Sequence, residues 1–273
     1  MSVSFVAGVV VVWFIAMAGA WAVQRVVGNS GWIDVTWTLA TGVISAGSIF
    51  AERNLSGDSL SARDWIVAGL LAVWALRLGG HIMARTLRGI DDPRYARLVE
   101  EWGERAGVRL FFFVQVQSVA GLLLTGSALA AAANRSSLGP LDLIGALVGA
   151  GALAGEAIAD AQLRRCAARD REAKQKTVCE AGLWAWSRHP NYFFEFLFWC
   201  ALPPMAFSGA GWSSPAFLSL LAPAMMYWLL ARVSGVPPLE EHMLRSRGAA
   251  FADYQRRVSA FFPFPPKAKK ASS

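Results

Sequence analysis

The chain has 273 residues, of which 55% are apolar, and its mean hydropathy of +0.39 is too high for an ordinary soluble domain. Its formal net charge of +7 is the one feature that would suit nucleic acid, and charge alone is weak support. We therefore expect an all-α integral membrane protein that contacts membrane lipid and has no nucleic-acid partner.

Seven apolar segments are each close to the ~20 residues that an α-helix needs to cross a bilayer. They are residues 4–24, 32–51, 64–84, 110–133, 139–161, 191–208 and 213–234. The first segment lacks a preceding basic region, so we interpret it as a retained helix rather than a signal peptide. We expect one seven-helix membrane domain over residues 1–265, followed by a disordered basic tail over residues 266–273.

Lys and Arg are distributed unevenly between alternate connecting segments. With the N-terminus outside, the inside segments hold 21 of these residues, whereas the outside segments hold three, Arg53, Arg63 and Arg135. Because cytoplasmic loops of membrane proteins carry an excess of Lys and Arg, this distribution predicts an outside N-terminus and a cytoplasmic C-terminus.

The three cysteines, Cys166, Cys179 and Cys200, have no metal-ligand spacing. All three fall on or near the predicted cytoplasmic side, where thiols stay reduced. We therefore expect neither a disulfide nor a metal site.

Polar residues gather where the fifth predicted span meets the cytoplasm. Glu156 and Asp160 lie four residues apart on one helical face, so they should point into the helix bundle. Ligand binding and structural ion pairing both remain open for Asp160. The basic residues that follow, including Arg164, Arg171 and Lys176, suit either phosphate groups or a solvated helix end.

A second polar group stands at the entrance of the sixth predicted span. It comprises Arg188, His189, Asn191, Tyr192 and Glu195, and a lipid-facing helix requires none of them. Asn191 and Glu195 share one helical face. The tract therefore predicts a cofactor pocket at the cytoplasmic edge.

A third group follows Pro237 and Pro238, which interrupt the last predicted span. Acidic and basic residues alternate there, as expected for a short amphipathic helix on the membrane surface. Because guanidinium groups bind phosphate in a bidentate manner, we expect this helix to cap the pocket, with Arg188 as a further phosphate ligand.

These residues together resemble those of a known family. The tract from Arg188 to Tyr192 with Glu195, the preceding Gly182-Leu183-Trp184, Asp160, the stretch from Glu240 to Tyr254, Asp34-Val35-Thr36-Trp37 and Trp74-Ala75-Leu76-Arg77-Leu78 look like bacterial membrane proteins grouped with steroid 5-alpha reductases. The resemblance covers residues 30–265. The Arg-His-Pro-Asn-Tyr tract alone is also similar to tracts in isoprenylcysteine carboxyl methyltransferases and sterol reductases.

The resemblance implies a bacterial inner-membrane enzyme that binds NADPH on its cytoplasmic side and reduces the carbon–carbon double bond of an enone, such as a 3-oxo-delta-4 steroid. Asn191 and Glu195 would hold the nicotinamide carboxamide, and the tail helix would close over the dinucleotide. The full set of cofactor-binding candidates is Asp160, Arg164, Arg171, Lys176, Arg188, His189, Asn191, Tyr192, Glu195, Glu241, Arg245 and Tyr254. No Gly-rich dinucleotide turn is present.

In that family a glutamate from span two and a tyrosine from span three polarise the ketone. This sequence has Asp34 for the first, with Trp37 on the same helical face, but no tyrosine in span three. Arg77 and His81 are the polar candidates there, although Arg77 would also suit an ion pair with Asp34 or Glu156, and His81 a structural role. Gln115 and Gln117 are further candidate lining residues.

Two other function classes remain open. An S-adenosylmethionine-dependent membrane methyltransferase is the main alternative, but its donor has no phosphate and leaves the basic segments unexplained. A transporter would place its charged residues near the middle of the bilayer, whereas most of them lie at one face here. We therefore expect a reductase that acts on a steroid-like lipid as a monomer.

Overall fold

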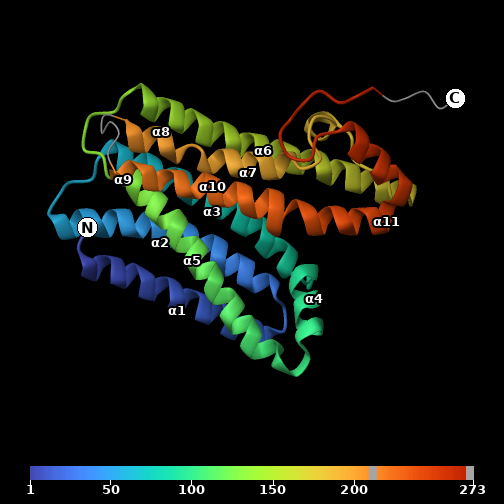
Figure 1. Ribbon diagram of the computed structural model, residues 1–273, viewed down its shortest axis with the longest axis horizontal. Helices are drawn as coiled ribbons and strands as arrows, with labels where there is room; N and C mark the ends of the chain where they lie inside the picture. The colour runs from blue at the N-terminus through green and yellow to red at the C-terminus, as the bar shows by residue number, and fades with distance from the viewer. Residues whose placement is uncertain (209–213, 269–273) are drawn as a thin grey trace. The chain divides into compact units, whose positions relative to one another are not determined.

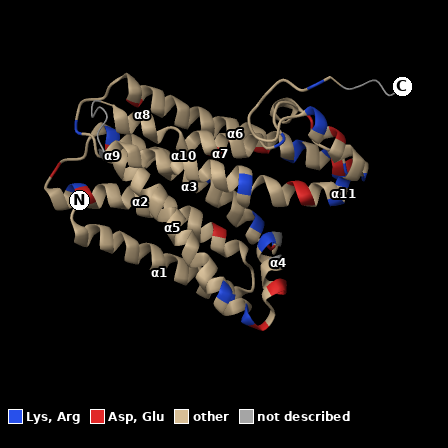
Figure 2. Ribbon diagram, in the orientation of Figure 1, with Lys and Arg blue, Asp and Glu red and all other residues tan. Residues whose placement is uncertain are grey.

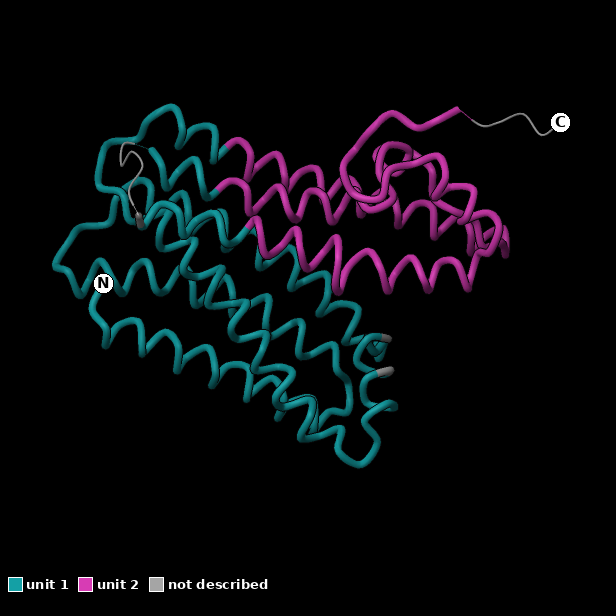
Figure 3. Tube along the Cα trace, in the orientation of Figure 1, with its two compact units in different colours: residues 1–146, 202–222 teal, residues 147–201, 223–273 magenta. Residues whose placement is uncertain are grey.

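The computed structural model describes residues 1–208 and 214–268, and over these ranges the protein is helical without β-strands. An isolated β-bridge joins Ser187 and Ser259. The chain divides into two compact units, coloured separately in Figure 3. Unit 1 comprises Met1–Ala146 and Leu202–Ala222, and unit 2 comprises Leu147–Ala201 and Pro223–Ser273.

Unit 1 contains the N-terminal helices that Figure 1 labels α1 to α5, together with α8 and α9. Their bounds are α1 (Val3–Val27), α2 (Gly31–Ser56), α3 (Ala62–Thr86), α4 (Pro93–Trp102), the short η1 (Gly103–Arg105), α5 (Ala106–Ala132), α8 (Leu202–Phe207), α9 (Ser214–Phe217) and η3 (Leu218–Leu220). Helix α6 (Pro140–Ala173) begins in unit 1 and continues into unit 2.

Unit 2 holds the rest of α6, then η2 (Gly182–Ala185), α7 (Pro190–Trp199), most of α10 (Leu221–Trp228), the π-helical η4 (Leu229–Val233) and α11 (Val236–Arg257). Within α11, Gly248 has a φ of 54°, so the backbone leaves helical geometry there. Pro237 and Pro238 lie in the first turn of α11, where the missing backbone N–H groups cost no helical hydrogen bond.

Local sequence signals explain several helix ends. Ser61 and Asp64 form a reciprocal capping box at the start of α3, and Asp92 caps α4 by accepting a hydrogen bond from the Arg94 N–H. Gly57 follows α2 with a φ of 70°, the left-handed conformation that glycine adopts without strain. Side-chain caps and glycine stops therefore set these boundaries.

Six helical stretches are long and apolar enough to cross a membrane, which indicates a membrane protein. Five of them contain the first five predicted spans to within one residue at the ends, and the sixth, Pro215–Arg257, contains most of the last one; residue 213 of that span lies outside the described ranges. The predicted span at 191–208 is divided instead into α7 and α8, with a turn at Cys200 and Ala201. The predicted count of seven is therefore not established.

Unit 1 is built around α2, which packs against α1, α3 and α5. Its core includes Trp13, Ile33, Tyr95 and Val114, all at most 3% exposed. Gly121 allows the close packing of α1 and α5, because a Cβ atom there would lie 2.2 Å from the Trp13 ring. The apolar core of this unit thus surrounds the first turn of α2 and the start of α4.

Two buried ion pairs fasten the opposite end of unit 1. Arg53 donates to Asp64 at 2.8 and 3.0 Å, and Arg63 donates to Asp142 at 2.7 and 2.8 Å. Arg135 pairs with Asp58 at the surface. The three basic residues that the sequence assigns to the outside are thus all neutralised by acids, two of them in the interior.

A disulfide between Cys166 and Cys179 shows that the expectation of reduced thiols was wrong. After α6 ends, Lys174 takes a φ of 51° and the chain turns back along the helix. This reversal places the two Cα atoms 5.7 Å apart, within the ordinary range for a disulfide. Cys200 is a free thiol.

The C-terminal segment after α11 folds back on unit 2. The backbone N–H of Phe264 donates to the Trp186 carbonyl at 3.0 Å, and that of Lys267 donates to the Arg257 carbonyl at 2.9 Å. The predicted disordered tail at 266–273 therefore contains at least one residue, Lys267, whose backbone is hydrogen-bonded to unit 2. Its residues 269–273 lie outside the described ranges.

Candidate functional site

The first polar cluster lies in unit 1, where α2 and α4 begin. The Tyr95 hydroxyl donates to Asp34 at 2.8 Å, and Arg94 donates to the other Asp34 oxygen at 2.5 Å. Asp92 caps α4 and also binds Arg94 at 2.9 Å, so the cap that starts the helix fixes the guanidinium as well. Both oxygens of Asp34 are thus occupied by donors.

Gln117 of α5 extends this cluster into the core. Its Nε2 donates to the Tyr95 hydroxyl at 2.7 Å, while the Trp37 indole donates to the Gln117 carbonyl at 3.0 Å. Tyr95 is 3% exposed and packs edge-on against Phe113. A chain of hydrogen bonds therefore runs from Gln117 through Tyr95 to Asp34 in largely apolar surroundings.

Charge around this cluster is balanced by neighbouring groups. Burial alone would raise the pKa of Asp92, but hydrogen bonds and charge from Arg94 outweigh it and lower the pKa below its usual value. Arg85 donates to Asp92 at 3.0 Å. Two carboxylates and two guanidinium groups thus meet at this end of unit 1.

The four residues predicted to act on the ketone are only partly assembled. Asp34 of α2 accepts from Tyr95 of α4, which in turn accepts from Gln117 of α5. Trp37 of α2 donates directly to the backbone carbonyl of Gln117. Arg77 is half-buried and His81 is exposed on α3. Within the described part of the chain, the side chains that bind Asp34 are Arg94 and Tyr95 rather than Arg77.

Tyr95 is the functional candidate that the sequence reasoning missed. The family resemblance places the second donor in span three, whereas this tyrosine follows the loop after that span. Asp92 and Pro93 form an N-cap followed by a proline, which is a standard sign of a new helix. That sign places Tyr95 in the first turn of α4, but it does not show which way the side chain points.

The second polar cluster lies in unit 2 and is centred on Glu240. Arg188 donates to its two oxygens at 2.6 and 3.1 Å, and Gln255 donates at 2.8 Å. His189 lies 3.0 Å from the same carboxylate through Nε2. Glu240 is thus held by three side chains at once.

Arg188 is committed to this cluster rather than available for phosphate. Beyond its two bonds to Glu240, it donates to the Gln255 carbonyl at 3.0 Å and to the Val258 carbonyl. A guanidinium has five N–H groups, so four of them are already in use. We interpret Arg188 as a clamp that fastens the entrance of α7 to α11.

The residues of the tract that follow Arg188 make contacts within α7 and with α6. The Asn191 amide lies 3.5 Å from Asp160 of α6, and the Trp199 indole donates to Glu195 at 3.0 Å. His189 is 3% exposed, stacks on Tyr192, and has a buried Nδ1 without a hydrogen-bond partner among the described residues. The structure thus places Asn191 of the tract beside Asp160.

Tyr254 also has a structural position. Its hydroxyl donates to the Trp184 carbonyl at 2.5 Å and lies 3.3 Å from the Ser187 carbonyl. Glu241 and Arg245 are exposed on α11 and pair with each other at 3.1 Å. The inward-pointing acid of this helix is therefore Glu240, its neighbour in sequence.

Charged residues of unit 2 gather on and around α11 (Figure 2). Arg164, Arg171 and Lys176 are exposed on the last turns of α6 and the segment after it. Within the described ranges these three side chains form no ion pair and are open to solvent.

Comparisons with curated proteins and with solved structures find no match. Residues 20–258 match the model of one family, described as "Protein of unknown function (DUF1295)". The match includes helices α2 to α11 and the residues of both polar clusters. Because it spans most of the chain, this protein belongs to that family.

Proposed function

We propose that this protein is a membrane reductase that uses NADPH to reduce the carbon–carbon double bond of an enone in a steroid-like lipid. The observation that carries the proposal is the hydrogen-bond chain from Gln117 through Tyr95 to Asp34. The family match is consistent with it, because that family is associated with steroid 5-alpha-reductase-like proteins.

The chemistry requires a donor aimed at the ketone. Hydride addition to the β carbon of an enone places negative charge on the ketone oxygen, which a fixed hydrogen-bond donor in a water-poor site stabilises. The Tyr95 O–H, which Asp34 accepts at 2.8 Å in the structure, would become such a donor when a bound ketone oxygen replaces Asp34 as its acceptor, while Gln117 donates to the Tyr95 oxygen at 2.7 Å. Asp34 then orients the hydroxyl as an acceptor, instead of donating to the ketone itself.

Residues of unit 2 fit a phosphate-bearing dinucleotide. Asn191 carries an amide that can pair with a carboxamide, and its bond to Asp160 is long at 3.5 Å, so little is lost when a ligand replaces it. The buried Nδ1 of His189 is a further polar atom without a partner among the described residues. Exposed Arg164, Arg171 and Lys176 supply cations for phosphate.

In this account each group of residues has a separate task. When bound, NADPH supplies the hydride, and Asn191 and Glu195 hold its carboxamide end. Arg188 and Tyr254 keep the entrance of α7 and the end of α11 in place rather than binding phosphate. The cofactor would reach the protein from the cytoplasm, the side to which the excess of Lys and Arg assigns these segments.

Cofactor binding is the experiment that separates this proposal from the methyltransferase alternative. Detergent-purified protein is titrated with NADPH and with S-adenosylmethionine by calorimetry. We expect NADPH binding that Asn191→Ala weakens by about tenfold, the loss of roughly one hydrogen bond. Gln175→Ala serves as a control, because Gln175 is an exposed polar residue of the same unit outside the proposed site.

Binding of S-adenosylmethionine in place of NADPH would contradict the proposal and assign the chain to the methyltransferases. Equal NADPH affinity in the wild type and Asn191→Ala would remove the assigned carboxamide contact.

A further inference from the structure

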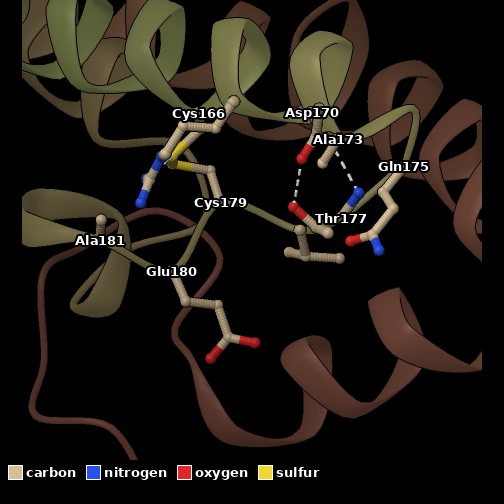
Figure 4. A pocket seen from close by; sticks show the side chains of 10 residues that line it. Cys166, Asp170, Ala173, Gln175, Thr177, Cys179, Glu180 and Ala181 are labelled. Carbon is tan, nitrogen blue, oxygen red and sulfur yellow. Dashed lines mark hydrogen bonds between the residues drawn. A yellow bond between two sulfur atoms is a disulfide. The ribbon is translucent and has the colours of Figure 1, made fainter.

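The Cys166–Cys179 disulfide borders an open pocket of about 370 Å³ in unit 2 that the proposed reaction does not use (Figure 4). Asp170 and Thr177 form another part of its wall, joined by hydrogen bonds of 2.5 and 2.9 Å. Glu180 and Ala181 complete the pocket beyond Cys179. The sulfur bridge is therefore reached from an open space rather than enclosed in a core.

The two sulfur atoms differ in their surroundings. Cys166 is 8% exposed and belongs to α6, whereas Cys179 is half-buried and belongs to the returning segment. Arg169, one turn along α6, places Nη2 3.3 Å from the Cys166 sulfur. A guanidinium at this distance stabilises negative charge on that sulfur, as cations do beside reactive cysteines.

We propose that this disulfide is a thiol–disulfide exchange site for a cellular thiol, with Cys179 as the sulfur that is attacked. The incoming thiolate forms a bond to the Cys179 sulfur as the Cys166–Cys179 bond breaks, and Cys166 leaves with the electron pair as a thiolate beside Arg169. A second thiol then attacks the mixed disulfide, releasing Cys179 as a thiolate and oxidising the two external thiols to a disulfide. Protons from the external thiols balance both thiolates.

Reduction removes the cross-link between Cys179 of the returning segment and Cys166 of α6. Hydrogen bonds from Thr177 to Asp170 and from Arg247 to the Thr177 carbonyl remain on one side of Cys179, and the Arg257–Glu180 pair remains on the other. The Val178 side chain packs against the cluster of Phe251, Tyr254 and Val258. The reduced protein therefore keeps its fold and loses only the cross-link at Cys179.

Glutathione supplies a direct test on the full-length protein in detergent. The mixed disulfide is trapped by acid and alkylation and located by peptide mapping, with Cys200 as an internal reference thiol. We expect the adduct on Cys179. An adduct mainly on Cys166, or no adduct and no released thiol, would overturn the proposal.

The role of Arg169 is tested by the rate of the same reaction. Arg169→Gln should slow reduction by roughly three- to tenfold, because the leaving thiolate loses its cation. Arg165→Gln is the matched control, since Arg165 is exposed on the same helix and one residue from Cys166 in sequence. Equal rates in the wild type and Arg169→Gln, or equal slowing in both variants, would contradict the assigned leaving group.

Discussion

Substitution of Tyr95 by phenylalanine removes one hydroxyl from the centre of the proposed ketone site. That hydroxyl takes part in two hydrogen bonds, at 2.8 Å to Asp34 and 2.7 Å from Gln117. Its loss leaves the buried Gln117 amide without an acceptor, which should cost about 1–3 kcal/mol of stability. Loss of a donor to the developing oxyanion should lower kcat by about 10²–10³-fold.

The assay is steady-state NADPH consumption with an enone steroid, combined with calorimetric NADPH binding. We expect Tyr95→Phe to lose turnover while its affinity for NADPH stays within about twofold of the wild type, because the proposed cofactor contacts lie on other residues. Tyr227→Phe is the matched control, since Tyr227 packs in an aromatic cluster with Phe196 and Phe262. A Tyr95→Phe kcat close to that of Tyr227→Phe would refute the reasoning.

The remaining predictions concern the ion pairs. Arg63→Met should lower the free energy of unfolding, measured with denaturant, by about 3–5 kcal/mol, because Asp142 stays buried without its partner. The double variant Arg63→Met with Asp142→Leu should recover part of this loss. If the double variant is less stable than Arg63→Met, the explanation fails. Glu240→Gln should also destabilise the protein, because Arg188 loses its charged partner in a largely buried position. Glu241→Gln, at an exposed neighbouring residue, should leave the stability unchanged; similar unfolding curves for the two variants would contradict this prediction.

The lengths of the apolar segments in the sequence predicted the positions of most of the long helices. Five predicted spans fall inside single helices to within one residue, because about 20 apolar residues have few stable alternatives to a helix in a membrane protein. The span at 191–208 failed as one helix because Pro203 and Pro204 cannot donate backbone hydrogen bonds to residues of the preceding turn. Hydropathy alone does not register that interruption.

The candidate site was predicted where its residues are neighbours in sequence or in helical spacing. Asn191, Glu195 and Asp160 follow from helical faces, and the structure brings Asn191 to Asp160. Tyr95 was missed because its contact with Asp34 joins residues 61 positions apart, with the rest of α2 and all of α3 between them. No local pattern encodes such a contact.

Register and chain reversal account for the other differences. Glu240 and Glu241 are adjacent acids, and only the position of α11 against Arg188 shows that Glu240 points inward. The Cys166–Cys179 bond depends on the turn at Lys174, whose positive φ is unusual for a residue other than glycine. Charge counting found Arg53 and Arg63 but gave no sign that both are buried with acids.

Transfer of a labelled hydride tests the central claim most directly. The purified protein is incubated with progesterone and NADPH that carries deuterium at its hydride position, and the product is identified by mass spectrometry and NMR. We expect a 4,5-reduced steroid with one deuterium at the β carbon. A reduced product with deuterium elsewhere, or NADPH bound without a reduced product from this or any other enone lipid, would contradict it.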